Sequence, residues 1–100
     1  MNTLEILDRL IGFPTLSRTP NVELIDFVTS LLGDTGARIT RLENEDGSRA
    51  NLYASIGPGD GGVMLSGHTD VVPVEGQDWS RPPFKLTEAE GRLYGRGTGL

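Results

Sequence analysis

Two stretches near the start of the chain carry apolar residues at helical spacing. The first lies between Asn2 and Gly12, and its apolar residues are Leu4, Leu7, Leu10 and Ile11. The second ends at Gly33, and its apolar residues are Leu24, Ile25, Val28, Leu31 and Leu32. Asparagine is a common N-terminal cap and glycine a common C-terminal stop of helices. The pattern therefore predicts helices over about 4–11 and 21–33, each with one face on a core.

Beyond residue 37 the pattern becomes that of strands. Residues 37–42 are a weak strand candidate, and the polar segment Glu43–Ser48 predicts a turn with Asp46-Gly47 at its tip. In the next stretch, apolar residues alternate with Asn51, Tyr53 and Ser55; they are Ala50, Leu52, Ala54 and Ile56. This period of two predicts a strand with one face on the core.

The apolar run Val63-Met64-Leu65 is unbroken, which predicts a strand covered on both faces. Residues 84–94 predict a hairpin across Glu90-Gly91, and we expect Trp79 and Phe84 to lie in the core. Two helices followed by several strands indicate the opening of an α/β domain with a mixed sheet.

The run ending at Leu65 leads into His68, the single histidine of the chain, and Asp70. Residues two apart on an extended backbone point the same way, so both side chains can face one ligand. A metal-bound imidazole usually donates its second N–H to a carboxylate. The spacing is thus compatible with His68 as a metal ligand and Asp70 as its orienting partner, or with a hydrogen-bonded surface pair. One histidine and one aspartate cannot close a zinc site, which needs three or four protein ligands.

Composition narrows the function classes further. The net charge is −5, and eight arginines and one lysine form no run, so neither nucleic acid nor an anionic membrane is an expected partner. No apolar run approaches the ~20 residues that span a bilayer, and the chain has no cysteine to supply a thiolate zinc site, so a cytoplasmic protein is expected. Arg92 and Arg96 could bind an anionic substrate, or could simply be solvated.

Three segments together resemble a known family. SGHTDVVPVEGQDWSRPPF (residues 66–84), GRLYGRGT (91–98) and ANLYASIGP (50–58) are similar to the N-terminal part of the zinc-dependent aminoacylase/carboxypeptidase family. The resemblance implies the N-terminal portion of a zinc-peptidase-like α/β catalytic domain, with His68 binding metal and Asp70 orienting its imidazole. It also implies two zinc ions, or cobalt, and a homodimer for the full-length family.

The activity implied is hydrolysis of a linear amide C–N bond in a small N-acylated amino acid. The expected reaction converts N-acetyl-L-ornithine to L-ornithine and acetate in cytoplasmic arginine biosynthesis. A related desuccinylase or dipeptidase and a non-catalytic, truncated binding or relict module are the alternatives.

The chain departs from the family pattern near its end. The family motif continues Gly-Arg-Gly-Thr-x-Asp, and Leu100 stands where the metal-bridging aspartate is expected. The chain has no counterpart of the family's Glu-Glu pair, which holds the general base. We therefore expect residues 1–100 to be a single incomplete segment of the catalytic domain, inactive alone, without the dimerisation domain and the remaining catalytic region.

Overall fold

The computed structural model describes residues 1–98. Its contacts divide the chain into two compact units. We call Thr19–Thr69 the α2 unit, and Met1–Arg18 together with the chain from Asp70 onward the α1 unit. Each unit has its own helix and its own antiparallel hairpin.

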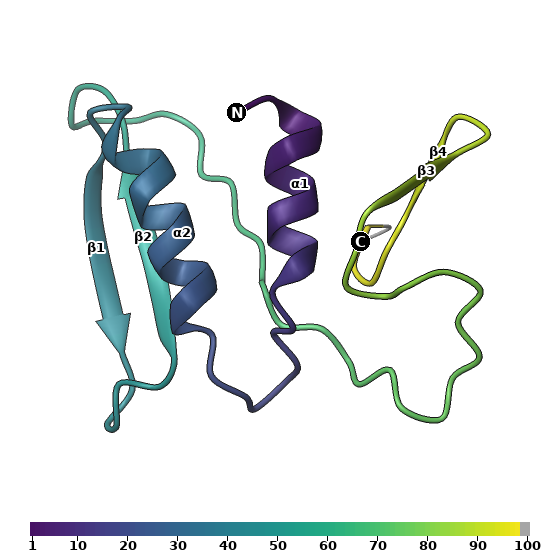
Figure 1. Cartoon of the computed structure of the whole chain (residues 1–100). Helices are drawn as coiled ribbons and strands as arrows, with labels where there is room; N and C mark the ends of the chain where they lie inside the picture. The colour runs from purple at the N-terminus through teal and green to yellow at the C-terminus, as the bar shows by residue number, and fades with distance from the viewer. Residues whose placement is uncertain (99–100) are drawn as a thin grey trace. The chain divides into compact units, whose positions relative to one another are not determined.

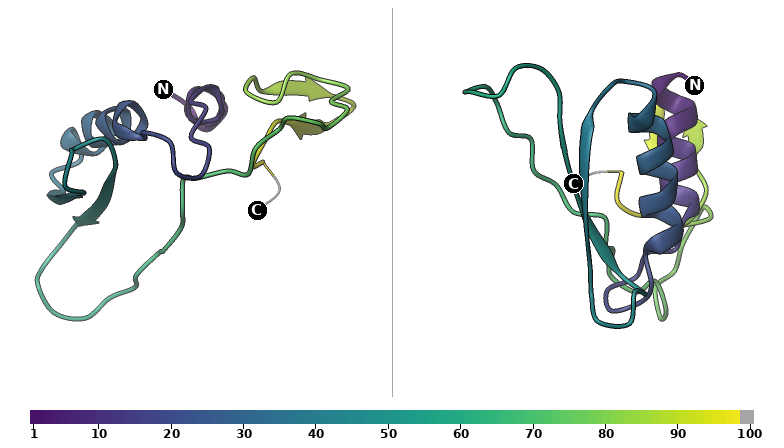
Figure 2. Two further views of the ribbon diagram at one scale, coloured as in Figure 1. Left: turned by 90° about the horizontal axis from the view of Figure 1, so that it is seen from below. Right: turned by 90° about the vertical axis from the view of Figure 1, so that its left-hand side faces the viewer.

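The α2 unit is a helix packed on a two-stranded hairpin. Helix α2 (Val22–Gly33) lies along strands β1 (Arg38–Glu43) and β2 (Ala50–Ser55), as Figures 1 and 2 show. The strands pair antiparallel from Arg38 opposite Ser55 to Glu43 opposite Ala50. The buried apolar side chains of this unit are Leu24, Ile25 and Ala50. The helix and both strands were predicted, and the structure confirms them within two residues at each end.

Asn21 joins the start of α2 to the start of β2. Its side-chain nitrogen Nδ2 donates to the carbonyl oxygen of Ala50 at 3.0 Å, and its Oδ1 accepts from the Ala50 amide at 2.8 Å. The backbone amide of Asn21 also donates to the Ser48 carbonyl at 3.2 Å. Asn21 occupies the cap position of α2, yet its side chain makes no capping bond, so the side-chain amide bonds to the hairpin instead.

The turn between β1 and β2 is the polar one that the sequence predicts. Gly47 has a positive φ of 73°, and Asp46 Oδ1 accepts from the hydroxyl of Ser48 at 2.6 Å and from its amide at 3.0 Å. Both bonds favour the ionised carboxylate, and the bond from the hydroxyl has the larger effect. They lower the pKa of Asp46 below its ordinary value of 3.8. The carboxylate thus stabilises the turn in its charged form.

The prediction of a buried strand at Val63–Leu65 is wrong. The chain from residue 57 to residue 69 has no helix or strand, and Figure 1 shows it as a plain tube after β2. Val63 and Leu65 expose 88% and 93% of their surface. A central strand needs partner strands and apolar layers on both faces, and within residues 1–98 no strand pairs with this run.

The α1 unit also combines a helix with a hairpin. Helix α1 (Thr3–Gly12) is capped by Asn2, whose Oδ1 accepts from the Glu5 amide at 2.9 Å, as the sequence predicts. Strands β3 (Thr87–Ala89) and β4 (Arg92–Tyr94) form the predicted hairpin. The Leu86 amide, just before β3, donates to Asp8 Oδ1 of α1 at 3.1 Å. The helix and the hairpin are thereby tied together.

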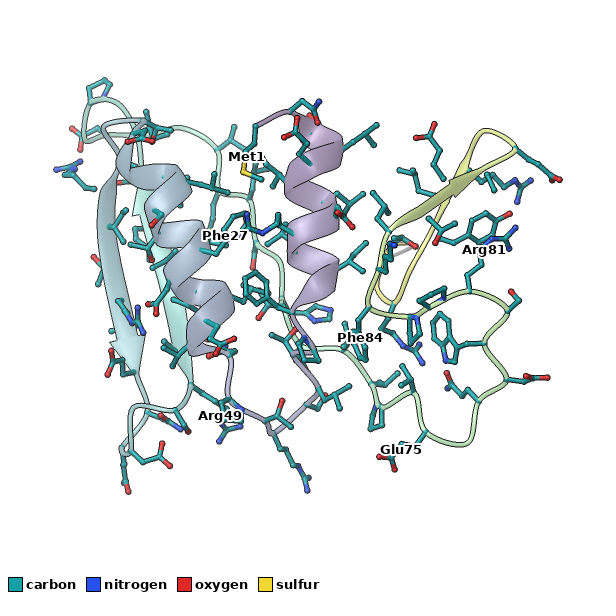
Figure 3. The ribbon with its side chains drawn as sticks, viewed as in Figure 1. Met1, Phe27, Arg49, Glu75, Arg81 and Phe84 are labelled. Atoms are coloured by element: carbon teal, nitrogen blue, oxygen red, sulfur yellow. The ribbon has the colours of Figure 1, made fainter. Side chains whose placement is uncertain are left out.

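Two cation–π contacts organise the loop before this hairpin. The Arg81 guanidinium lies 3.9 Å from the centroid of the Tyr94 ring, and Figure 3 shows it beside the hairpin. Arg96 lies 4.7 Å from the centroid of the Trp79 ring. Trp79 and Phe84 are only half-buried, so their predicted place in the core is wrong. The Tyr94 and Trp79 rings lie under arginine side chains.

The architecture confirms the predicted α/β class, two helices followed by strands. The strands pair antiparallel, and an isolated parallel bridge joins Leu16 to Val71. Among residues 1–98 there is no helix long and apolar enough to cross a membrane.

Candidate functional site

The segment that leads into the predicted site is open to solvent. Residues 61–70 are all exposed, His68 and Asp70 included. A Cβ added to Gly67 would meet nothing within 4 Å, so no protein group of the described chain requires glycine there. An exposed imidazole next to open backbone is accessible to a ligand, although exposure by itself does not identify one.

Asp70 is held by the loop that follows α1. The Ser17 hydroxyl donates to Asp70 Oδ2 at 2.8 Å. The neighbouring Val71 amide donates to the Thr15 carbonyl at 2.8 Å, and the Ser17 amide donates to the Val71 carbonyl at 2.9 Å. These bonds form the parallel bridge around Leu16. The backbone on the C-terminal side of Asp70 and one oxygen of its carboxylate therefore have defined partners.

The two predicted site residues lie on either side of the division between the units. His68 belongs to the end of the α2 unit, whereas Asp70 begins the second part of the α1 unit. The predicted orientation of both side chains toward one ligand therefore stays a prediction.

The donor set of the described chain does not fit a complete metal site. Imidazole nitrogen and carboxylate oxygen are zinc donors, so His68 has suitable chemistry. However, no group of three or more His, Cys, Asp and Glu side chains that could hold a metal occurs in residues 1–98. The predicted replacement of a bridging aspartate by Leu100 lies outside the described residues.

The two arginines proposed for an anionic substrate differ in their surroundings. Arg92 in β4 is exposed. Arg96 is half-buried: it stacks on Trp79, donates to Gln77 Oε1 and lies 3.4 Å from the Pro73 carbonyl oxygen. Simple solvation is therefore the wrong description for Arg96, which holds the loop over residues 73–79.

Sequence reasoning missed Ser17 as a neighbour of Asp70. The two residues are 53 positions apart, and neither periodicity nor motif spacing links them. The one local sign was a pair of hydroxyl side chains, Thr15 and Ser17, directly after a predicted helix. Thr15 is buried at 6% exposure, which is unusual for a polar residue in a loop.

Comparison with known proteins finds two similarities. Residues 64–100 match peptidase family M20/M25/M40, and this range includes His68 and Asp70. The chain is also 41% identical over 103 residues to the acetylornithine deacetylase of Shigella sonnei (strain Ss046), an alignment that covers 95% of the chain. It spans only 27% of the length of that relative. The predicted resemblance to part of such an enzyme is confirmed.

Proposed function

Because residues 64–100 belong to the M20/M25/M40 peptidase family, we propose that the chain forms the N-terminal part of a metal-dependent amidohydrolase. The proposed reaction is hydrolysis of N-acetyl-L-ornithine to L-ornithine and acetate, in the cytoplasm and within arginine biosynthesis. The observation that carries this proposal is the 41% identity to an acetylornithine deacetylase across 95% of the chain.

His68 is the proposed metal ligand of this segment, and Asp70 is its proposed orienting partner. An imidazole that binds metal through one nitrogen can donate its other N–H to a carboxylate, which fixes the ring. The remaining ligands of the proposed zinc or cobalt ions, the general base and the dimerising surface then belong to parts of the enzyme outside residues 1–98.

A chimera provides the test of function. The chain replaces the segment that it aligns with in the Shigella sonnei enzyme, and ornithine release from N-acetyl-L-ornithine is measured. We expect turnover, a loss of about 100-fold or more with His68→Ala, the upper end of the cost of losing a group at a metal site, and near-normal turnover with Ser66→Ala. Preference for an N-succinylated amino acid or a dipeptide would redirect the proposal to a related hydrolase. A folded, inactive chimera would contradict it.

The chain alone is proposed to be inactive and to bind zinc weakly, because a single histidine with a nearby carboxylate falls short of the three or four ligands of a zinc site. Calorimetric titration of zinc into the isolated chain checks this expectation. Tight binding that disappears in His68→Ala would show instead that the chain closes its own metal site.

A further inference from the structure

The loop after α1 presents Ser17 to the Asp70 carboxylate through paired backbones. Val71 both donates to Thr15, at 2.8 Å, and accepts from Ser17, at 2.9 Å. These two bonds fix the position of residues 15–17 beside residues 70 and 71. The Ser17 hydroxyl therefore reaches Asp70 from a backbone that is already in place, which lowers the entropy lost in making the side-chain bond.

The bond from the Ser17 hydroxyl limits the orientation of the Asp70 carboxylate. Ser17 Oγ is 2.8 Å from Asp70 Oδ2, and the same hydroxyl is 3.5 Å from the Val71 carbonyl oxygen. An ionised carboxylate offers two oxygens with about four lone-pair sites. The bond at Oδ2 limits rotation of the group, and a carboxylate can accept several hydrogen bonds at once, one from an imidazole N–H among them.

The backbone beside Ser17 has a conformation that arginine rarely adopts. Arg18 has a positive φ of 71° and directly follows Ser17. Left-handed φ values are uncommon outside Gly, Asn and Asp, and they persist where the surrounding structure imposes them. The turn at Arg18 is thus a second feature that sets where residue 17 lies.

We propose that Ser17 is a positioning residue that holds the Asp70 carboxylate in the orientation it needs to orient the His68 imidazole. The inference rests on the proposed function, because it presumes that Asp70 acts on His68. Ser17 would bind neither substrate nor metal. Its removal should therefore reduce turnover and leave substrate affinity unchanged.

The test uses four variants of the chimera that contains the full chain. Ser17→Ala removes the hydroxyl, Ser17→Thr keeps it, and Ser17→Cys replaces it with a weak donor of similar size. Ser80→Ala is the matched control, because Ser80 is an exposed serine of the same unit. For each variant kcat and KM for N-acetyl-L-ornithine and the thermal unfolding midpoint are measured.

We expect Ser17→Ala to lower kcat about 10-fold with KM within about twofold, at the low end of the ~10- to 100-fold loss caused by removing groups that support metal ligands. Ser17→Thr should restore kcat, and Ser80→Ala should behave as the parent. If Ser17→Ala does not fold, a kcat of Ser17→Cys well below that of Ser17→Thr supports the proposal.

Three results would overturn the proposed role of Ser17. The first is a Ser17→Ala enzyme equal to Ser80→Ala in kcat. The second is a rise in KM with unchanged kcat, which would place Ser17 on the substrate. The third is a fall in kcat that follows the unfolding midpoint and that Ser17→Thr does not restore. An inactive parent chimera would instead contradict the proposed function, so the two failures are distinct.

Discussion

Replacing Asn21 with alanine should destabilise the α2 unit by removing the link between its helix and its hairpin. The Asn21 side chain makes one bond to the Ala50 carbonyl oxygen and one to the Ala50 amide, at 3.0 and 2.8 Å. Ala50 is only 4% exposed. Both bonds are part-buried, so water replaces them only in part, and the substitution leaves a donor and an acceptor of Ala50 without their protein partner.

The magnitude follows from these two bonds. A neutral hydrogen bond contributes ~0.5–1.5 kcal/mol net, and a buried group left without a partner costs ~1–3 kcal/mol. Partial access of water at the start of β2 places the expected loss near the low end, about 2 kcal/mol for the pair. Loss of a helix cap adds nothing, because the Asn21 side chain makes no bond to α2.

The measurement is urea unfolding of the chain, followed by circular dichroism. Asn51→Ala serves as the matched control, since Asn51 is an exposed asparagine one position into β2. Asn21→Asp keeps the acceptor oxygen and removes the Nδ2 donor. We expect it to lose at least half as much free energy of unfolding as Asn21→Ala, because one bond remains while a carboxylate oxygen now faces the Ala50 carbonyl oxygen.

An unfolding free energy of Asn21→Ala within about 0.5 kcal/mol of that of Asn51→Ala, the usual range for surface substitutions, would refute this reasoning. It would mean that the two bonds to Ala50 are replaced by water at no net cost. A large loss in Asn51→Ala would equally contradict the account, because that side chain is exposed.

Two further predictions concern packing and pH. A Cβ on Gly95 would lie 3.2 Å from two methyl carbons of Ile11, which is 6% exposed, so Gly95→Ala should cost about 1–3 kcal/mol in urea unfolding; Gly59→Ala, whose Cβ would meet nothing within 4 Å, should cost little. Because bonds from Ser48 lower the pKa of Asp46, its carboxylate stabilises the fold above the unfolded pKa and loses this effect as the pH falls through the folded pKa. The unfolding free energy of Asp46→Asn should therefore decline less than that of the parent below about pH 4; identical acid profiles would contradict this prediction.

The elements whose contacts join residues close in the sequence could be predicted from the local pattern of residues. Helices α1 and α2 and both hairpins follow from apolar spacing, glycine stops and turn residues, all of which act over a few positions. The strand expected at Val63–Leu65 depended on distant partner strands, and an apolar run does not show whether they are present. The prediction that Trp79 lies in the core failed for a related reason, because Trp79 packs against Arg96, 17 positions later in the sequence.

The candidate site shows the same difference between residues close in the sequence and residues far apart in it. His68 and Asp70 were proposed from their spacing and from the resemblance to a family, because both signals lie in one short segment. Ser17 could not be found, since its bond to Asp70 joins residues 53 positions apart. The predicted joint orientation of His68 and Asp70 remains a prediction that sequence spacing alone supports.

The most direct test of the account is the metal content of the chimera. Zinc retained per chimera after extensive dialysis is measured for the parent and for His68→Ala, with circular dichroism to show that both are folded. If His68 is a ligand of a site completed by other parts of the enzyme, the parent should retain two zinc ions and His68→Ala should lose at least one. Equal zinc content in two folded proteins would contradict the assignment of His68 as a metal ligand.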